Sequence, residues 1–351
     1  MPCQTGKAER SWMDFKLHTS FDSLASCAPA WNELVAAGIT NAPFLRYEYL
    51  STWWSSLGGG EWKDGKLAVV TATENDRLAG IAPLFLASDR EDLAALMLLG
   101  SIEISDYLDL VVHPESLQPF LAGLLDWLGQ TYPEAWSLLD WYNLPEHSPT
   151  LTALKAESVK RAWTYTEEIY QPTPYIPLPG DFEAYLNSLD KKQRHEVRRK
   201  MRRAEESVRG VRWYIVEDES RLDAEMEAFM VLMAHDPEKD AFLTRAMRAQ
   251  MKACAHAAFR GAYLQLAFLE VDGEKACVYL NFDYANRIWV YNSGLDPKFM
   301  DISPGWVLLG YLLKWANDHK RAEFDFMRGN EQYKYRFGAV DRQVMRVQVR
   351  R

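Results

Sequence analysis

The chain has 351 residues, of which 48% are hydrophobic and 25% charged, and its formal net charge is −9. This length favours two domains over a single core, and the balance of residues excludes a disordered chain. The negative charge argues against general binding to DNA or to an anionic membrane, although a local basic patch can override such an average.

Cysteine and histidine positions give no metal site or disulfide framework. The four cysteines (Cys3, Cys27, Cys254 and Cys277) are far apart, and the seven histidines show no metal-ligand spacing. The N-terminus lacks the apolar stretch of a signal peptide, and no apolar run reaches the roughly 20 residues of a membrane-spanning helix. We therefore expect a cytoplasmic protein without a membrane span.

The first half of the chain alternates predicted helices and strands. Its turn Asn75-Asp76-Arg77 separates two apolar runs and predicts a hairpin. The expected elements are helices at 22–37, 47–57 and 117–128, the hairpin at 67–86, and strands at 107–112 and 136–141.

The second half repeats this order. A hairpin with Asp272-Gly273 at its turn is followed by a strand at 288–293, a helix at 306–316 and a strand at 324–327. Tyr107-Leu108-Asp109 before Pro114 matches Tyr291-Asn292-Ser293 before Pro297, which indicates a duplication. The proline-rich segment 170–180 is the expected boundary. We predict an N-terminal lobe over residues 1–170 and a C-terminal lobe over residues 171–351.

One segment departs from the acidic average. Nine of the 40 basic residues lie between Asp190 and Arg209, where Val197, Met201, Ala204 and Val208 follow helical spacing. A helix is predicted that docks through this apolar stripe and leaves a cationic face free. That face is a solvated surface, an electrostatic guide for a phosphorylated substrate, or a surface for a tRNA arm.

The segment Asp301-Ile302-Ser303-Pro304-Gly305 joins a strand to a helix and predicts an anion site. A helix N-terminus offers unpaired N–H groups and the positive end of a dipole. Proline is suited to the first helical position, and Gly305 permits close approach of a phosphate. The alternative is that Ser303 caps its own helix by accepting from the N–H of Trp306.

Two motifs resemble a known family. Leu295-Asp296-Pro297-Lys298 through Ser303-Pro304-Gly305, and Phe324 through Lys334, are similar to the cellulose-biosynthesis-associated (CelD-like) acetyltransferases of the GNAT superfamily. Pro43-Phe44 with Trp53-Trp54, and Ser105-Asp106-Tyr107-Leu108-Asp109, also look like family features. The resemblance implies an α/β fold with mixed sheets in two tandem GNAT-like lobes, related in architecture to the Fem-type aminoacyl transferases. It also implies acetyl-CoA or another acyl-CoA as donor, with the diphosphate bound at Ser303, Pro304, Gly305 and Trp306.

Candidate catalytic residues follow the last predicted strand. Tyr333 is a candidate proton donor to a departing thiolate or alkoxide, Lys334 a candidate partner for a carboxylate or phosphate, and Asp325 a candidate base. Alternatively, Tyr333 packs in a short helix, Lys334 is solvated, and Asp325 accepts from nearby backbone N–H groups. The candidate substrate-binding residues are Tyr279, Asn281, Asp283, Tyr291, Arg328 and Arg198.

These observations predict transfer of an acyl group from a thioester to an amine or hydroxyl of a small-molecule or glycan-linked acceptor. The C-terminal lobe would bind the donor, and the N-terminal lobe would be structural or acceptor-binding. Two other hypotheses stay open: aminoacyl transfer from tRNA, which the overall charge disfavours, and a degenerate pair of lobes that acts as a scaffold. The sequence leaves the oligomeric state open.

Overall fold

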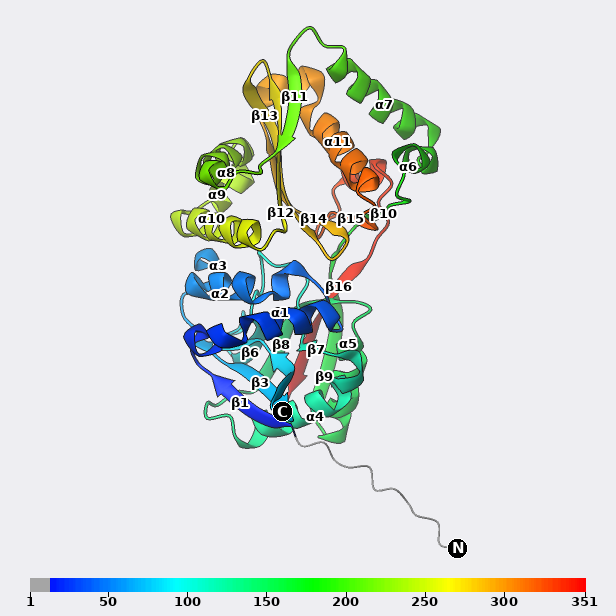
Figure 1. Ribbon diagram of the computed structural model, residues 1–351. Coiled ribbons are helices and arrows are strands. Elements are labelled where there is room, and N and C mark those ends of the chain that lie inside the picture. The colour runs from blue at the N-terminus through cyan, green and yellow to red at the C-terminus, as the bar shows by residue number, and fades with distance from the viewer. Residues whose placement is uncertain (1–12) are drawn as a thin grey trace, which may run out of the picture.

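Two lobes are stacked along the long axis of the computed structural model, which describes residues 13–351 (Figure 1). Cys3 and the expectation about the N-terminal segment lie outside the described residues. The other cysteines are free, and Cys254 and Cys277 are buried. Across residues 13–351, no helix has both the length and the apolar character needed to cross a bilayer.

The N-terminal lobe contains a four-stranded antiparallel sheet, a six-stranded mixed sheet and five α-helices. The four-stranded sheet has the order β1 (Asp14–His18), β3 (Val69–Glu74), β4 (Arg77–Ala82), β7 (Val111–Val112). The six-stranded sheet has the order β2 (Lys66–Leu67), β5 (Leu84–Ser88), β6 (Ala94–Leu98), β8 (Leu138–Pro145), β16 (Gln343–Arg350), β9 (Thr164–Pro172). The helices are α1 (Ala28–Ala37), α2 (Tyr47–Ser55), α3 (Leu57–Gly60), α4 (Leu117–Gln130) and α5 (Pro149–Lys160), with 3-10 helices η1 (Phe21–Cys27), η2 (Pro43–Leu45) and η3 (Pro114–Ser116).

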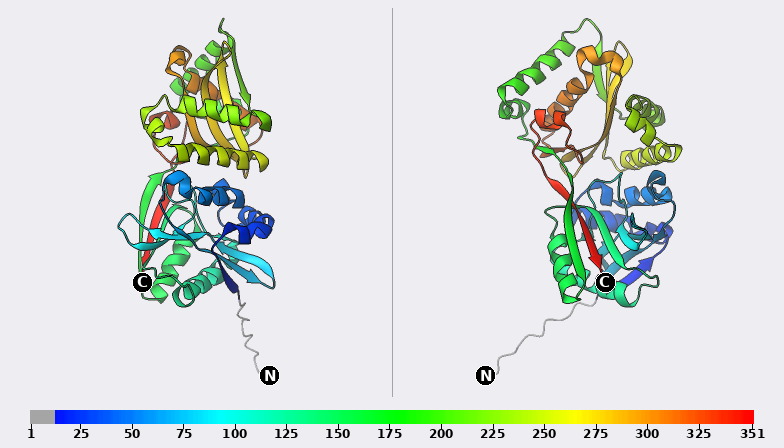
Figure 2. Two further views of the ribbon diagram at one scale, coloured as in Figure 1. Left: turned by 90° about the vertical axis from the view of Figure 1, so that its left-hand side faces the viewer. Right: turned by 180° about the vertical axis from the view of Figure 1, so that it is seen from behind.

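The C-terminal lobe is one six-stranded sheet between two layers of helices (Figures 1 and 2). Its order is β10 (Tyr175–Pro177), β15 (Glu323–Asp325), β14 (Arg287–Leu295), β13 (Glu274–Tyr284), β12 (Leu264–Val271), β11 (Val211–Ile215). One face carries α6 (Phe182–Ser188), α7 (Lys191–Glu205) and α11 (Pro304–Asp318), and the other carries α8 (Glu219–Met233), α9 (Pro237–Phe242) and α10 (Arg245–Arg260). The 3-10 helix η4 (Pro297–Ile302) and the short α12 (Gln332–Arg336) complete the lobe.

Both predicted hairpin turns are confirmed. Asn75 and Asp76 have φ values of 51° and 61°, and β3 and β4 pair on either side of them. Asp272 and Gly273 have φ values of 54° and 82°, and they join β12 to β13. Asn, Asp and Gly tolerate this left-handed backbone, which matches the twist of the strands that they connect.

The basic helix is confirmed in position but is shorter than predicted. Val197, Met201 and Ala204 are buried under α7, as the apolar stripe predicts. Val208 was predicted to extend this stripe, and that prediction is wrong because α7 ends at Glu205 and the Val208 side chain is fully exposed.

One hydrophobic core runs through both lobes. Phe44 and Tyr49 of the N-terminal lobe lie with their ring centroids 5.9 and 6.4 Å from that of Phe282 on β13. Helix α10 packs on α2 and α3 across the same boundary. A second core fills the space between the sheet of the C-terminal lobe and helices α7 and α11. The N-terminal lobe is therefore packed directly on one helical layer of the C-terminal lobe.

The last strand returns to the first lobe. β16 pairs antiparallel with β8 on one side and with β9 on the other, so it lies inside the N-terminal sheet (Figure 2). The predicted division at residue 170 placed residues 343–350 in the C-terminal lobe. In the structure these residues form β16, which belongs to a sheet of the N-terminal lobe. Sequence spacing carries no information about such a pairing, because β16 and β8 are about 200 residues apart.

Candidate functional site

The strands β14 and β15 diverge at the centre of the C-terminal sheet. They pair in parallel only over Arg287–Trp289 and Glu323–Asp325. β14 then continues to Leu295, whereas β15 ends at Asp325. The edge of β14 beyond Trp289 therefore has no strand partner, and it faces a wedge-shaped opening in the sheet.

Two side chains cover the main chain of this free edge. The Ser293 N–H donates to Asn292 Oδ1 at 2.8 Å. The Ser293 carbonyl accepts from Lys239 Nζ at 2.6 Å. Lys239 reaches this position from α9, and its burial lowers the pKa of its ammonium group.

A cavity of about 350 Å³ lies along this edge. We call it the edge cavity. It extends from α8 and α9, across the ends of β13 and β14, to the start of α11. Its lining residues are Leu232, Met233, His235, Asp236, Pro237, Lys239, Cys277, Tyr279, Ser293, Gly294, Leu295, Pro297 and Gly305.

The start of α11 gives the edge cavity one free N–H group. Ser303 has φ 55°, and its carbonyl accepts from the N–H groups of Trp306 at 3.0 Å and Val307 at 3.1 Å. The Ser303 side chain makes no capping hydrogen bond. Pro304 has no N–H, and within residues 13–351 the Gly305 N–H has no acceptor. Of the four predicted donor-binding residues, Gly305 alone lines this cavity.

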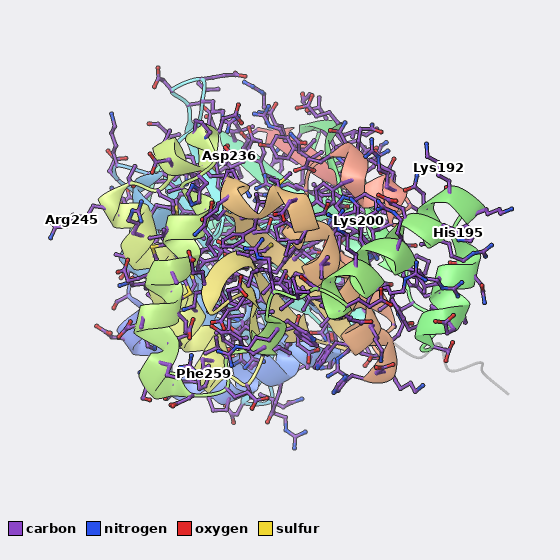
Figure 3. All side chains as sticks on the ribbon, turned by 90° about the horizontal axis from the view of Figure 1, so that it is seen from above. Lys192, His195, Lys200, Asp236, Arg245 and Phe259 are labelled. Carbon is purple, nitrogen blue, oxygen red and sulfur yellow. The ribbon has the colours of Figure 1, made fainter. Side chains whose placement is uncertain are left out.

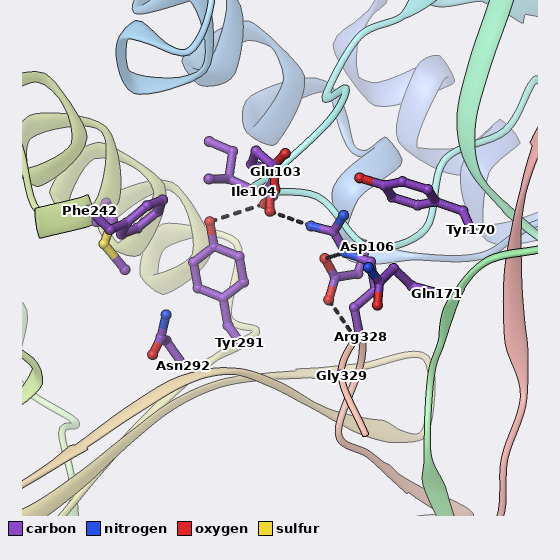
Figure 4. A pocket seen from close by; sticks show the side chains of 11 residues that line it. Glu103, Ile104, Asp106, Tyr170, Gln171, Phe242, Tyr291, Asn292, Arg328 and Gly329 are labelled. Atoms are coloured by element: carbon purple, nitrogen blue, oxygen red, sulfur yellow. Dashed lines mark hydrogen bonds and ion pairs between the residues drawn. The ribbon is translucent and has the colours of Figure 1, made fainter. Parts of the chain in front are cut away.

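A second cavity, of about 290 Å³, lies between the lobes, and we call it the interlobe cavity (Figure 4). Tyr291 and Asn292 of β14 form one wall, and Arg328 and Gly329 after β15 form another. The remaining lining residues are Glu103, Ile104, Asp106, Tyr170, Gln171, Phe242 and Met251. The opening between β14 and β15 therefore leads directly to the boundary between the lobes.

Arg328 is held by the N-terminal lobe. Its Nε donates to Asp106 Oδ1 at 2.6 Å, and its main-chain N–H donates to Asp106 Oδ2 at 2.9 Å. Its guanidinium also donates to the Glu103 carbonyl (Figure 4). On the opposite wall, the Tyr291 hydroxyl donates to the Ile104 carbonyl at 3.1 Å. Loop 103–106 is thereby fixed to both diverging strands.

Lys334 is buried and points into the turn that follows β15. Its ammonium donates to the carbonyls of Phe326, Arg328 and Gly329 at 3.3, 3.0 and 2.8 Å. It also lies 2.8 Å from Glu331 Oε2. These contacts differ from both predicted environments, a solvated lysine and a substrate contact. They fix the turn that carries Arg328 into the interlobe cavity.

Tyr279 lines the edge cavity, and Tyr333 lies near it without lining either cavity. Burial, followed by the nearby Tyr333, raises the pKa of the Tyr279 phenol well above its usual value. Burial also raises the pKa of Tyr333, with Glu331 as a smaller cause. Both phenols therefore keep their protons at neutral pH.

Asp325 is fully buried at the end of β15. It accepts from the Tyr107 hydroxyl at 2.9 Å, from the Arg342 guanidinium at 2.7 Å and from the Met327 N–H at 2.7 Å. Burial raises its pKa to about 6, and Arg342 opposes this shift. Its two oxygens thus join β15 to the N-terminal lobe.

Three predicted substrate residues lie outside both cavities. Asn281 Nδ2 donates to Gln265 Oε1 at 2.9 Å inside the sheet. Asp283 accepts from Arg321 at 2.6 and 2.8 Å. Arg198 pairs with Glu183 on the outer surface of α7. The structure brings Tyr291 and Arg328 to the interlobe cavity, and Tyr279 and Gly305 to the edge cavity.

The sequence interpretation did not assign Asp106, Tyr107 or Lys239. Asp106 and Tyr107 belong to a segment that carries the family resemblance, so a signal for them was present. Lys239 lies in the six-residue α9, and nothing in its sequence context indicates that it reaches β14. Within the described part of the chain, no group of three or more His, Cys, Asp or Glu side chains is placed to hold a metal ion.

The comparisons with known proteins agree with this geometry. Residues 191–335 match the family model of the acetyltransferase (GNAT) domain. No curated protein matches the sequence.

Several solved structures share the fold of nearly the whole chain. The crystal structure of FemX has a TM-score of 0.66 at 12% identity, over 95% of this chain and 97% of that one. A conserved protein of unknown function from Bacteroides thetaiotaomicron has a TM-score of 0.60 at 12% identity, over 96% and 100%. L-PGS from Bacillus licheniformis has a TM-score of 0.51 at 12% identity, over 85% and 86%. The chain thus has a mixed α/β fold of two GNAT-like lobes, and residues 191–335 of its C-terminal lobe match a GNAT domain.

Proposed function

We propose that the protein transfers an acyl group from an acyl-CoA thioester to an amine or hydroxyl of a small-molecule or glycan-linked acceptor. The observation that supports this proposal is the divergence of β14 and β15, which leaves β14 without a strand partner beyond Trp289. Along this part of β14, Asn292 lines the interlobe cavity and the next residue, Ser293, lines the edge cavity that also contains Gly305. The GNAT match over residues 191–335 supports it. The cytoplasmic location and membership of the cellulose-associated group stay predictions.

The proposed donor lies along β14. Its diphosphate meets the Gly305 N–H at the positive end of α11, and its pantetheine amides meet the main chain of Ser293. A Cβ at Gly305 would meet only Leu295 Cδ2, at 3.5 Å, so there is space at this position. The Lys239 ammonium donates a hydrogen bond to the Ser293 carbonyl. This hydrogen bond has to break when a pantetheine amide binds the same carbonyl.

The thioester carbonyl then lies where the edge cavity approaches the interlobe cavity, and the acceptor enters between the lobes. The acceptor nitrogen or oxygen attacks the carbonyl carbon, the C–S bond breaks, and the proton lost by the acceptor balances the one gained by the thiolate. Tyr333 is the proposed proton donor because it lies beside Tyr279 at the edge cavity, and its phenol carries a proton at neutral pH. The contacts of Lys334 and Asp325 favour a positioning role for both residues, through the turn after β15.

Calorimetric titration with acetyl-CoA tests the proposal. We expect saturable binding that is weakened in Gly305→Pro, which removes the free N–H, and retained in Gly305→Ala, which keeps it. The melting temperature of each variant shows whether the fold is intact. Absence of binding to the wild-type protein contradicts the proposed function, and equal binding by both variants contradicts the role of Gly305.

Transfer of an aminoacyl group from tRNA is the second candidate. The observation that favours it is α7, whose eight basic and two acidic residues give a net charge of +6 in a chain of net charge −9. Titration with charged tRNA separates it from the first candidate. If neither ligand binds, the remaining hypothesis is a scaffold without a donor.

A further inference from the structure

A cavity of about 410 Å³ lies at the outer end of α7. Arg199, Arg202, Arg203 and Arg209 line it, together with Asp301 and Ile302 at the end of η4. We call it the arginine cavity.

The charges of this cavity are only partly neutralised. Arg199 pairs with Glu196 on α7, and Arg209 pairs with Asp272 at 3.0 Å and with Asp301 at 3.4 Å. Arg202 and Arg203 have no carboxylate within ion-pair distance anywhere in residues 13–351, although Glu206 also lines the cavity. Two guanidinium groups, each able to bind a phosphate through two N–H donors, are therefore available.

The arginine cavity adjoins the start of α11. Ile302 directly precedes Ser303, and the Lys200 ammonium lies 4.1 Å from the ring centroid of Trp306 in the first turn of α11. Met201 of α7 packs tightly against Gly310 of α11, because a Cβ at Gly310 would lie 2.8 Å from the Met201 Sδ. This contact fixes where α7 crosses α11. Seen from above, α7 with Lys200 lies on one side of α11, and Asp236, which lines the edge cavity, lies on the other (Figure 3).

We propose that the arginine cavity binds a phosphate monoester at the nucleotide end of the donor, beyond the diphosphate at Gly305. This inference rests on the proposed function, because it needs a donor that lies along β14. A phosphate monoester carries a charge between −1.5 and −2 at neutral pH, which Arg202 and Arg203 together neutralise. Coenzyme A has such a group on its ribose.

The shape and composition of the site favour a small phosphorylated ligand over single-stranded RNA or a membrane. The arginines line a cavity beside the helix start, whereas binding of a single-stranded nucleic acid requires an extended track with aromatic side chains for base stacking. α7 contains no Phe, Tyr or Trp. The exposed Val208 at the rim is a single apolar residue, which is too little for stable insertion into a bilayer.

Comparison of coenzyme A with 3′-dephospho-coenzyme A tests the inference by calorimetry at fixed ionic strength. We expect the wild-type protein to bind coenzyme A at least about tenfold more tightly. The double variant R202A/R203A should lose this preference and keep its affinity for the dephosphorylated ligand. The control K191A/K192A removes the same charge from the other end of α7, at two exposed residues, and should keep the preference.

The outcomes separate the inference from the proposed function. Equal binding of both ligands by the wild type, or equal losses in the two double variants, overturns the inference and leaves the donor proposal standing. Binding of neither ligand overturns the donor proposal and the inference together. If R202A/R203A instead loses only binding to tRNA or to vesicles containing anionic phospholipid, the cavity serves a macromolecular partner and the inference is wrong.

Discussion

At the scale of single residues, Lys334 shows how a buried charge can position a site without contacting a ligand. Its ammonium satisfies three carbonyls of the turn that ends in Gly329, so the hydrogen bonding of these three carbonyls depends on one side chain. An unsatisfied buried carbonyl costs free energy, because it loses water without gaining a donor. The position of Arg328 in the interlobe cavity is therefore coupled to Lys334.

We expect Lys334→Met to lower the free energy of unfolding by about 2 kcal/mol. Urea unfolding measures this change, and Arg336→Met, at an exposed position of the same short helix, is the control. Unchanged stability in Lys334→Met would contradict the positioning role. It would return Lys334 to the catalytic role predicted from the sequence.

Glu61 is a carboxylic acid whose protonation depends on its burial beside the interlobe cavity. Its carboxylate accepts from the N–H of Ile102 at 2.9 Å and from that of Glu103 at 3.3 Å, beside the interlobe cavity. Burial raises its pKa from 4.5 to about 7. The folded protein thus holds a proton that the unfolded chain releases between these values.

Because this pKa is raised on folding, the stabilising effect of the proton is complete below pH 4.5 and is lost as the pH rises through 7. We expect the stability of the wild type to fall by up to about 3 kcal/mol relative to Glu61→Gln between pH 4.5 and 7.5. Urea unfolding across this range measures the difference. The exposed variant Glu33→Gln should follow the wild type, and parallel curves for the wild type and Glu61→Gln would contradict the shift.

At the scale of elements, Gly294 sets the distance between β14 and α8. A Cβ at this position would lie 2.4 Å from the N of Met233 and 2.5 Å from the C of Leu232. Both atoms belong to the backbone, so a side chain at residue 294 has to push the end of α8 away from the sheet. The same three residues line the edge cavity, which ties its shape to this contact.

Gly294→Ala should destabilise the protein by at least about 2 kcal/mol and should also weaken donor binding. Gly129→Ala in α4 is the matched control, because a Cβ there meets nothing within 4 Å. It should leave stability unchanged or raise it by less than about 1 kcal/mol. Denaturant unfolding measures the stability, and acetyl-CoA titration measures donor binding. If Gly294→Ala changed neither quantity, α8 could move to accept the side chain, and Gly294 would not set the distance between β14 and α8.

Local elements of the fold were predictable from the sequence, and long-range contacts were not. The turns at Asn75-Asp76 and Asp272-Gly273 follow from residues that tolerate positive φ, and the buried stripe of α7 follows from helical spacing. The contact of Arg328 with Asp106 joins residues 222 positions apart. Charge and periodicity give no signal for such a pair, so Arg328 was predicted as a substrate residue without the carboxylate that holds it.

At the scale of the whole molecule, the two lobes are joined by a shared core and by a buried polar link. The core formed by Phe44, Tyr49 and Phe282 crosses the boundary, and Tyr107 donates to Asp325 beside it. An open boundary between domains would be more polar and more mobile. The interlobe cavity is therefore bordered by surfaces that are fixed to each other.

This arrangement predicts that the lobes unfold together and that both need β16. Val344, Val347 and Val349 are buried, and β16 hydrogen-bonds to β8 and β9 on its two sides. Removal of residues 343–351 opens the N-terminal sheet at an inner strand and exposes this apolar surface. We expect the full chain to unfold in one calorimetric transition whose van't Hoff and calorimetric enthalpies agree, and the shortened chain to show no cooperative transition. Removal of Arg351 alone, outside the strand, should leave the transition intact. Two separate transitions in the full chain, or a C-terminal lobe that still melts cooperatively after the truncation, would show that the lobes fold independently.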